Sequence, residues 1–220
     1  MDWGKIINFT DYSHLDIGLI MAGTIFWIIT YVFILRNAIK NKFVEMPSPA
    51  AAANLAWEFV WAFFIVTNLG LLFQWGLRIW FIMDVFIFYY VLLYGVKQYN
   101  NEVLKKNFTW STIAQVVVWV PAFYYFYKEG YDTLMGTTSA YLITIPMAIL
   151  FIVNFVNSTK KSNFSKEVAI SKLLGNSFMM TFVFVHHEGF IFVKLITVVV
   201  LFLNILYVIM VFKNKNVTHA

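Results

Sequence analysis

Acidic side chains inside apolar segments are the residues of this chain whose type and position could do chemistry. Glu58 is the only charged residue between Glu45 and Arg78, in a segment that is otherwise apolar and long enough to cross a bilayer. An unpaired ionised group there would cost several kcal/mol of desolvation. The Glu58 carboxyl is therefore expected either to be a neutral group that joins two helices or to belong to a functional site. A carboxylic acid kept neutral at pH 7 can act as a general acid.

Polar and aromatic residues recur around Glu58 with helical spacing. Asn54, Glu58, Trp61 and Asn68 follow one another at steps of 4, 3 and 7 residues, which predicts that they share one face of a helix. Such a face would be costly against lipid, so it should point into the interior of a helix bundle. Asn54 lies one turn before Glu58 and could donate a hydrogen bond to its carboxyl or orient its proton.

A second acid, Asp84, occupies the next apolar segment and has the same two interpretations as Glu58. Arg78 precedes it by six residues, near the expected membrane surface, and falls on a different helical face, so a direct ion pair is not expected. Asn204 and Tyr207 are three residues apart in the last apolar segment and could face the same cavity as the acids.

Aromatic side chains lie close in sequence to both acids. Trp57 and Trp61 flank Glu58, and Trp80 and Phe81 precede Asp84. The face of an aromatic ring stabilises a cation within about 6 Å of its centroid. A pocket with aromatic walls and one buried acid would suit a reaction that starts with protonation and proceeds through carbocations. It would equally suit an apolar ligand that undergoes no chemistry.

Metal and thiol chemistry are not expected. The chain has no cysteine, which excludes disulfides, thiol nucleophiles and thiolate ligands. His186, His187 and Glu188 form a cluster, but adjacent histidines on a helix point roughly 100° apart and no third ligand is suitably spaced. We therefore predict no metal site and no cofactor.

Composition and hydropathy indicate what must position these residues. Of the 220 residues, 61% are hydrophobic and 12% are charged, and the mean hydropathy is +0.73, which is typical of a polytopic membrane protein and not of a soluble domain. Runs of about 20 apolar residues predict seven membrane-spanning helices in a single all-α domain, 1–220. The sixth run reaches the length of a membrane span only if it starts near Val168 and the Lys172 side chain snorkels to the membrane surface. The expected spans are 17–35, 50–73, 79–96, 108–127, 135–157, 168–187 and 195–212.

The distribution of basic residues predicts the orientation. Twelve of the sixteen Lys and Arg residues lie in the first, third and fifth connections, at the start of the sixth span or in the C-terminal tail. The positive-inside rule therefore predicts an N-terminus outside and a C-terminus in the cytoplasm. Because the basic residues lie in short connections between apolar spans, no nucleic-acid partner is expected, whereas membrane lipid is.

Two segments resemble a known family. A basic loop with Arg36, Lys40 and Lys42 leads to Met46-Pro47 and then to Asn54-Leu55-Ala56-Trp57-Glu58. The second segment runs from Arg78 through Trp80-Phe81 and Asp84 to Tyr94-Gly95. Together they are similar to the integral-membrane, seven-helix terpene cyclases of meroterpenoid and indole-terpenoid biosynthesis, and we interpret the chain as a bacterial-type member in the inner (plasma) membrane. The similarity in sequence covers residues 30–96.

The resemblance implies a metal-independent, class II-like cyclisation. In that family an acid protonates an alkene or epoxide of a prenyl chain, and a base ends the carbocation cascade. The resemblance maps the family's second-helix Glu, which is the proton donor or its electrostatic partner, onto Glu58. We take Glu58 as the acid and expect Asp84 to be a second catalytic acid or base. The expected substrate-binding residues are Asn54, Trp57, Trp61, Arg78, Trp80, Phe81, Asn204 and Tyr207. A second family acid, an Asp in the last helix, is replaced here by Asn204, and an amide cannot protonate an alkene.

The substrate is expected to be a hydrophobic isoprenoid or a prenylated aromatic compound; free prenyl, diphosphate and epoxide forms all stay open. Two other functions are considered. A retinal-binding photoreceptor would need a lysine in the middle of the seventh span, and Lys194 lies only at its edge. A non-catalytic protein that binds or transports lipids or isoprenoids is the alternative, which the replacement of the family acid by Asn204 keeps open.

Overall fold

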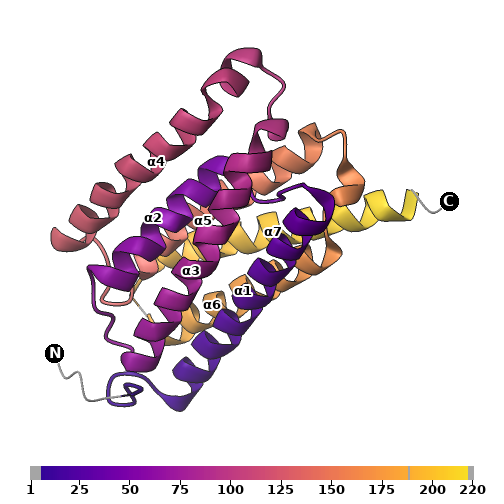
Figure 1. Cartoon of the computed structure of the whole chain (residues 1–220). Helices are drawn as coiled ribbons and strands as arrows, with labels where there is room; N and C mark the ends of the chain where they lie inside the picture. The colour runs from indigo at the N-terminus through magenta and orange to yellow at the C-terminus, as the bar shows by residue number, and fades with distance from the viewer. Residues whose placement is uncertain (1–5, 188, 218–220) are drawn as a thin grey trace.

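The computed structural model describes residues 6–187 and 189–217 and contains seven α-helices in that part of the chain (Figure 1). This agrees with the all-α class and the number of helices expected. The α-helices are α1 (His14–Asn41), α2 (Ser48–Phe63), α3 (Leu71–Tyr94), α4 (Glu102–Lys128), α5 (Thr137–Asn157), α6 (Lys166–His186) and α7 (Ile191–Val217), with short 3-10 helices η1 (Gly95–Gln98) and η2 (Lys161–Asn163).

Local sequence explains where several helices begin. At the start of α1, the Ser13 hydroxyl accepts a hydrogen bond from the Asp16 backbone while the Asp16 carboxylate accepts one from the Ser13 backbone, which is a capping box. Asn101 and Ser165 cap α4 and α6 in the same way, through side-chain oxygens that accept backbone N–H groups. These caps satisfy donors that the helix itself leaves unpaired.

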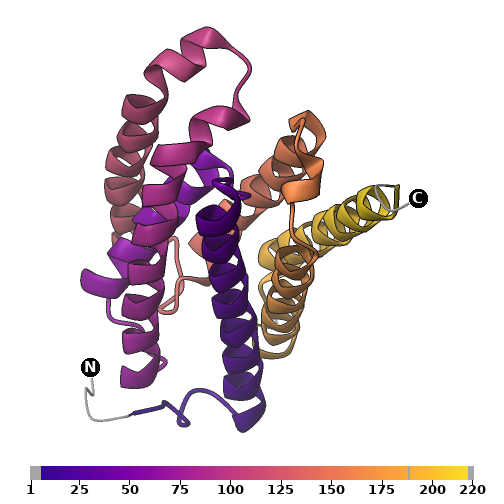
Figure 2. The same ribbon diagram turned by 45° about the vertical axis from the view of Figure 1, so that its right-hand side comes forward.

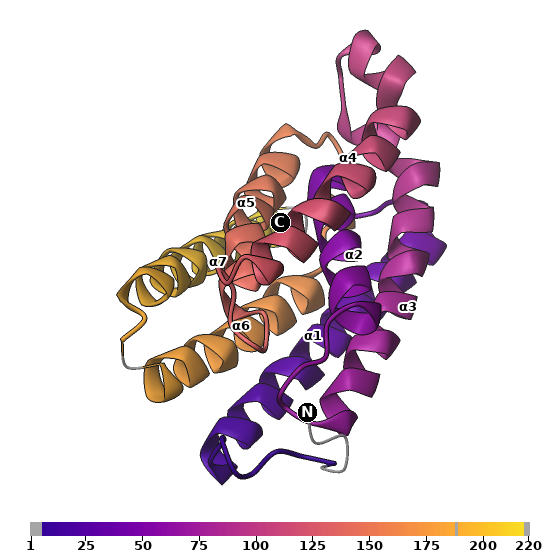
Figure 3. The ribbon, with the colours of Figure 1, turned by 90° about the vertical axis from the view of Figure 1, so that its left-hand side faces the viewer.

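Helix α2 lies at the centre of the bundle, and 13 of its 16 residues are buried. It packs against α3, α4 and α5. Helix α1 packs mainly against α6, and α7 packs against both α5 and α6. Figures 2 and 3 show α3 and α4 on one side of the molecule and α6 and α7 on the other. A residue on α2 therefore has helices on several sides, which is the environment that a buried acid requires.

Five helical segments of the described chain are long and apolar enough to cross a membrane. They are His14–Asn41, Leu71–Gln98, Thr137–Asn157, Lys166–His186 and Ile191–Asn214. Helix α2 has only 16 residues, about 24 Å at 1.5 Å per residue, and therefore falls short of a full bilayer core. The count of seven spans, the single domain and the orientation of the termini stay predictions.

The expected helical segment 50–73 is wrong at its C-terminal end, because α2 ends at Phe63 and α3 already begins at Leu71. The Gln74 side chain explains the break. Its amide nitrogen donates to the carbonyls of Trp61, Ala62 and Ile65 at 2.9, 3.1 and 3.3 Å, and its oxygen accepts the Thr67 backbone N–H. Carbonyls at the end of α2 thus find a partner without water. Asn68 consequently lies in this connection and not on the polar face of α2.

Candidate active site

A buried hydrogen-bond network joins four side chains from α1, α2 and α3. The Tyr31 hydroxyl donates to Glu58 Oε1 at 2.8 Å. The Asn54 amide nitrogen lies 3.1 Å from Glu58 Oε1, 2.6 Å from Asp84 Oδ2 and 2.5 Å from the Tyr31 hydroxyl. The contact expected between Asn54 and Glu58 is therefore present. The same amide also brings the two acids together, which their sequence positions did not indicate.

Both acids are almost completely removed from solvent, with 2% of Glu58 and 1% of Asp84 exposed. Among the described residues, neither carboxyl forms an ion pair. Glu58 Oε2 and Asp84 Oδ1 are buried and make no hydrogen bond there. Each acid thus has one oxygen that accepts hydrogen bonds and one oxygen without a partner.

Glu58 borders a cavity of about 170 Å³ that is lined by residues of α1, α2, α3, α5 and α6 and of the connections between them. Tyr31 and Asn54 line it as well, so most of the network meets the cavity directly. Asp84 is not a lining residue and is connected to the cavity through Asn54. Glu58 is the only acidic residue in the lining, and no Lys, Arg or His of the described chain contributes to it.

The cavity wall is mainly aromatic and apolar. Trp57 and Trp80 line it as expected, together with Trp27, Phe73, Tyr141 and Phe182 from other helices. The Trp57 indole is fixed by a 2.7 Å hydrogen bond from Nε1 to Ser139 Oγ. Rings of this kind can stabilise positive charge near their faces.

Three of the expected substrate-binding residues lie outside the lining. Trp61 is buried and packs against Trp57, with 5.8 Å between the ring centroids. Phe81 contacts Phe59 and Phe63 instead of the cavity. The Arg78 guanidinium lies 4.5 Å from the Trp75 ring and donates to a backbone carbonyl of α2. Although these three residues are close to the acids in sequence, their side chains lie on other faces of α2 and α3.

Asn204 and Tyr207 do not face the cavity either, which corrects the expectation for α7. Asn204 Oδ1 accepts a hydrogen bond from Lys172 Nζ at 2.5 Å, and the same Nζ lies 5.4 Å from the Tyr207 ring centroid and 4.4 Å from that of Phe151. The expectation that Lys172 snorkels is also wrong, since its side chain is fully buried. Asn204 therefore partners a lysine and not the acids.

Comparisons with known proteins identify the family. The model of the Pyr4-like transmembrane terpene cyclases matches residues 6–210. The chain belongs to this family. It is 25% identical over 171 residues to the Pyr4-family terpene cyclase mfmH of Annulohypoxylon moriforme, an alignment that covers 76% of this chain and 69% of that protein. No solved structure shows a significant match.

Two further relatives are terpene cyclases by name. Terpene cyclase ascF of Acremonium egyptiacum is 33% identical over 79 residues, and terpene cyclase macJ of Penicillium terrestre is 35% identical over 75 residues. These alignments cover 36% and 34% of this chain, and 28% of the length of each of the two relatives. This terpene cyclase is thus an integral membrane enzyme of terpenoid biosynthesis. All three relatives are fungal, so they do not support a bacterial type or a bacterial inner membrane.

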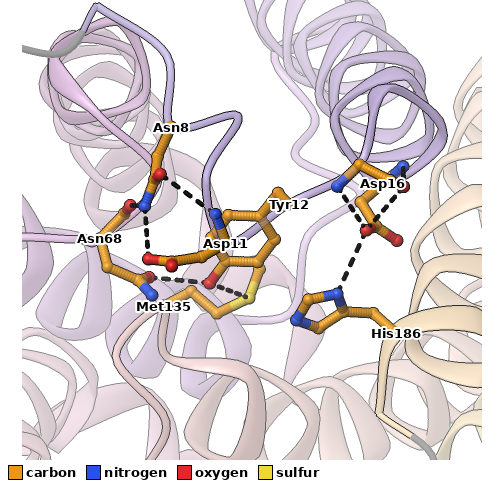
Figure 4. Close-up of polar contacts among 8 residues, drawn as sticks. Asn8, Asp11, Tyr12, Asp16, Asn68, Met135 and His186 are labelled. Carbon is orange, nitrogen blue, oxygen red and sulfur yellow. Dashed lines mark hydrogen bonds and ion pairs between the residues drawn. The ribbon is translucent and has the colours of Figure 1, made fainter.

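The segment before α1 contacts residues beside the cyclase cavity (Figure 4). The Tyr12 hydroxyl donates to Asn68 Oδ1 at 2.9 Å and lies 3.7 Å from the sulfur of Met135, which lines the cavity. Burial raises the pKa of the Tyr12 phenol. Asn68, expected on the polar face of α2, instead ties this segment to the connection between α2 and α3.

His186 and His187, two members of the cluster for which no metal site was predicted, take part in other contacts near this segment. His186 stacks on Tyr12, with ring centroids 4.8 Å apart, and its Nδ1 lies 3.2 Å from Asp16 Oδ2 (Figure 4). His187 contacts the rings of Phe182 and Phe190. Glu188, the third member, lies outside the described residues.

Residues that sequence reasoning missed complete the site of this cyclase. Tyr31 makes the shorter of the two hydrogen bonds to Glu58, and it lies only four residues from the end of the predicted span 17–35, in the interfacial region where Tyr is common, so no signal in the sequence pointed to this role. Ser139 and Asp132 hold Trp57, and the Ser139 hydroxyl donates to Asp132 Oδ2. Burial raises the pKa of Asp132, against the effect of hydrogen bonds from Ser139 and from backbone N–H groups.

Proposed function

We propose that this family member is a proton-initiated cyclase of a prenyl chain or its epoxide, with Glu58 as the general acid. The observation that carries the proposal is the position of Glu58: among the described residues it is the only acid that lines the aromatic-walled cavity, and two neutral donors hold its carboxyl. A buried carboxyl without a cationic partner favours its neutral form, which is the form a general acid needs. Family membership favours this enzymatic role over lipid binding or transport.

The hydrogen bonds indicate which oxygen holds the proton. Glu58 Oε1 accepts from both Tyr31 and Asn54, so in the neutral acid the proton belongs on Oε2, which has no partner in the described residues. Transfer of that proton to an alkene carbon or an epoxide oxygen leaves a carboxylate. The two donors already in place at Oε1 would stabilise the charge that develops there, without any rearrangement.

The cavity wall would then support the cation. Protonation generates a carbocation on the prenyl chain, and internal double bonds attack it to close rings. Trp57, Trp80 and Trp27 surround the space with ring faces that attract positive charge. Loss of a proton from the last cation ends the cascade, and the Glu58 carboxylate is the acceptor that the lining offers. The proton given and the proton returned balance, so the product is an isomer of the substrate.

The lining also favours a substrate without a diphosphate inside the cavity. A diphosphate carries at least two negative charges, and the described lining has no Lys, Arg or His to compensate them. An alkene or epoxide on an isoprenoid or a prenylated aromatic compound fits these walls. We assign Asp84 a supporting role, in which it holds the Asn54 amide and through it the Glu58 carboxyl.

A product assay by mass spectrometry tests this assignment. Membranes that contain the wild type, Glu58→Gln or Glu102→Gln are offered prenylated aromatics, their epoxides, and farnesyl and geranylgeranyl compounds. Glu102 lies at the exposed start of α4 and provides the same chemical change away from the cavity. We expect an isomer of unchanged mass from the wild type and Glu102→Gln, and its loss in folded Glu58→Gln. Conversion that survives Glu58→Gln would refute the choice of acid, and no conversion by the folded wild type would refute the proposed reaction.

A further inference from the structure

A chain of hydrogen bonds connects the cavity wall to the turn that joins α4 to α5. Trp57 Nε1 donates to Ser139 Oγ at 2.7 Å, and Ser139 Oγ donates to Asp132 Oδ2. Trp57 lines the cavity beside Glu58, whereas neither Ser139 nor Asp132 does. The Trp57–Ser139 hydrogen bond joins α2 to α5 between residues 82 positions apart, and Trp57 is next in sequence to the proposed acid Glu58.

Asp132 is itself held firmly by the start of α5. Its Oδ1 accepts hydrogen bonds from the backbone N–H groups of Thr133, Thr138 and Ser139 at 2.8, 2.9 and 3.3 Å. The Ser139 hydroxyl is the donor in its bond to Asp132 Oδ2, because a carboxylate has no proton to donate. The lone pairs of that hydroxyl are then left for the Trp57 N–H. The chain therefore has one direction, from the indole through the hydroxyl to the carboxyl.

The same turn also packs against the ring of Trp57. Gly136 has a φ of +77°, and a Cβ built on it would lie 2.9 Å from a ring carbon of Trp57 and 2.6 Å from one of Trp61. A side chain at this position would collide with both indoles, so glycine lets the backbone lie directly against them. Trp57 is thus fixed by a hydrogen bond at its nitrogen and by a close backbone contact at its edge.

We propose that Asp132 and Ser139 are positioning residues that fix the Trp57 indole toward the reacting chain and thereby determine which cyclised product forms. This inference rests on the proposed function. The attraction between a ring face and a cation depends on the ring's orientation, so a tilted indole would favour a different cation among those of similar energy. Consecutive hydrogen bonds polarise one another, which increases the electron density that the indole offers.

A double-mutant cycle separates this role from a general effect on packing. The ratio of the main cyclised isomer to the other isomers is measured for the wild type, Ser139→Ala, Trp57→Phe and the double variant. Ser139→Ala should change the ratio by roughly two- to tenfold, which corresponds to the loss of one neutral hydrogen bond. In the Trp57→Phe background, which has no N–H, the same change should leave the ratio as it is. Asp132→Asn should alter the ratio in the same direction as Ser139→Ala.

Ser171→Ala is the matched control, because Ser171 is a buried serine that bonds to Thr30 and does not line the cavity. It should leave the product ratio unchanged even if it lowers the melting temperature. The inference is overturned if Ser139→Ala has no effect on the ratio, or if it changes the ratio equally with and without the Trp57 N–H.

Nuclear magnetic resonance of indole ¹⁵N-labelled tryptophan in detergent micelles provides a readout that needs no turnover. The Trp57 signal is the one that disappears in Trp57→Phe, and its proton should move upfield in Ser139→Ala because the hydrogen bond is lost. An unmoved signal overturns the inference. If the wild type forms no product, the proposed function fails and the selection of products fails with it, while an upfield shift would still establish the hydrogen-bond chain.

Discussion

Replacement of Asn54 by leucine is expected to lower the free energy of unfolding by about 2–4 kcal/mol, because this amide joins two buried acids. Asp84 Oδ2 has its hydrogen bond from Asn54, and Oδ1 has none among the described residues. Leucine fills a similar volume but leaves the Asp84 carboxyl without a partner, which costs about 1–3 kcal/mol. Glu58 keeps the Tyr31 hydroxyl and loses one bond of about 1 kcal/mol.

The double variant Asn54→Leu/Asp84→Leu tests whether the unpartnered Asp84 carboxyl causes the loss of stability. If the cost arises from an orphaned carboxyl, its removal should restore stability, so the double variant should be more stable than the sum of the two single changes predicts by more than about 1 kcal/mol. Unfolding by SDS in mixed micelles, followed by far-UV circular dichroism, measures the free energies. Asn176→Leu is the control, because that buried amide nitrogen has no hydrogen bond in the described structure. Strict additivity, or a loss below about 0.5 kcal/mol for Asn54→Leu, would refute the proposed link.

Three further outcomes are expected. Glu58→Gln should reduce kcat by roughly 10²–10⁴, whereas Asp84→Asn, which acts only through Asn54, should cost less than about tenfold; rates on the same membranes decide between them. Gly136→Ala should lower the free energy of unfolding by roughly 2–5 kcal/mol through its positive φ and its clash with two indoles, measurable in the SDS titration. Burial raises the pKa of Asp132 in the folded state, so the folded protein binds its proton more tightly and stability falls as pH rises above about 4 through the folded pKa. Asp132→Asn cannot titrate, so its stability relative to the wild type should rise between pH 4 and pH 7; a constant difference would contradict this.

Local signals in the sequence were sufficient to predict the number of helices and the contact between Asn54 and Glu58. Long apolar runs form helices in a bilayer because each backbone group then has an internal partner, and seven helices are found in the described chain. The spacing of four residues between Asn54 and Glu58 brings their side chains together on any α-helix, whatever surrounds it. These features depend on neighbours within one or two turns.

The remaining contacts depend on residues far apart in the chain, and the sequence contains no local sign of them. Helix α2 ends at Phe63 because Gln74 from the next helix satisfies its last carbonyls, although residues 59–66 remain apolar throughout. Ser139 and Asp132 have the ordinary composition of a helix start, and only the packing of α5 on α2 gives them Trp57 as a partner. Nearness in sequence was also misleading for Arg78 and Phe81, which belong to other faces of α3.

Lys172 gives a physical reason why this chain can have an amide where the family resemblance implies an acid. The Lys172 nitrogen is fully buried, donates to Asn204 Oδ1 and lies over the Phe151 ring. A carboxylate at position 204 would form a buried ion pair with this lysine, and its charge would be neutralised there instead of serving the cavity. Asn204 meanwhile lies outside the lining, whereas Glu58 and Asp84 meet at the amide of Asn54. Under the proposed function, the acids that serve the cavity therefore come from α2 and α3, and a scheme with one acid on α2 and another on α7 is not expected for this chain.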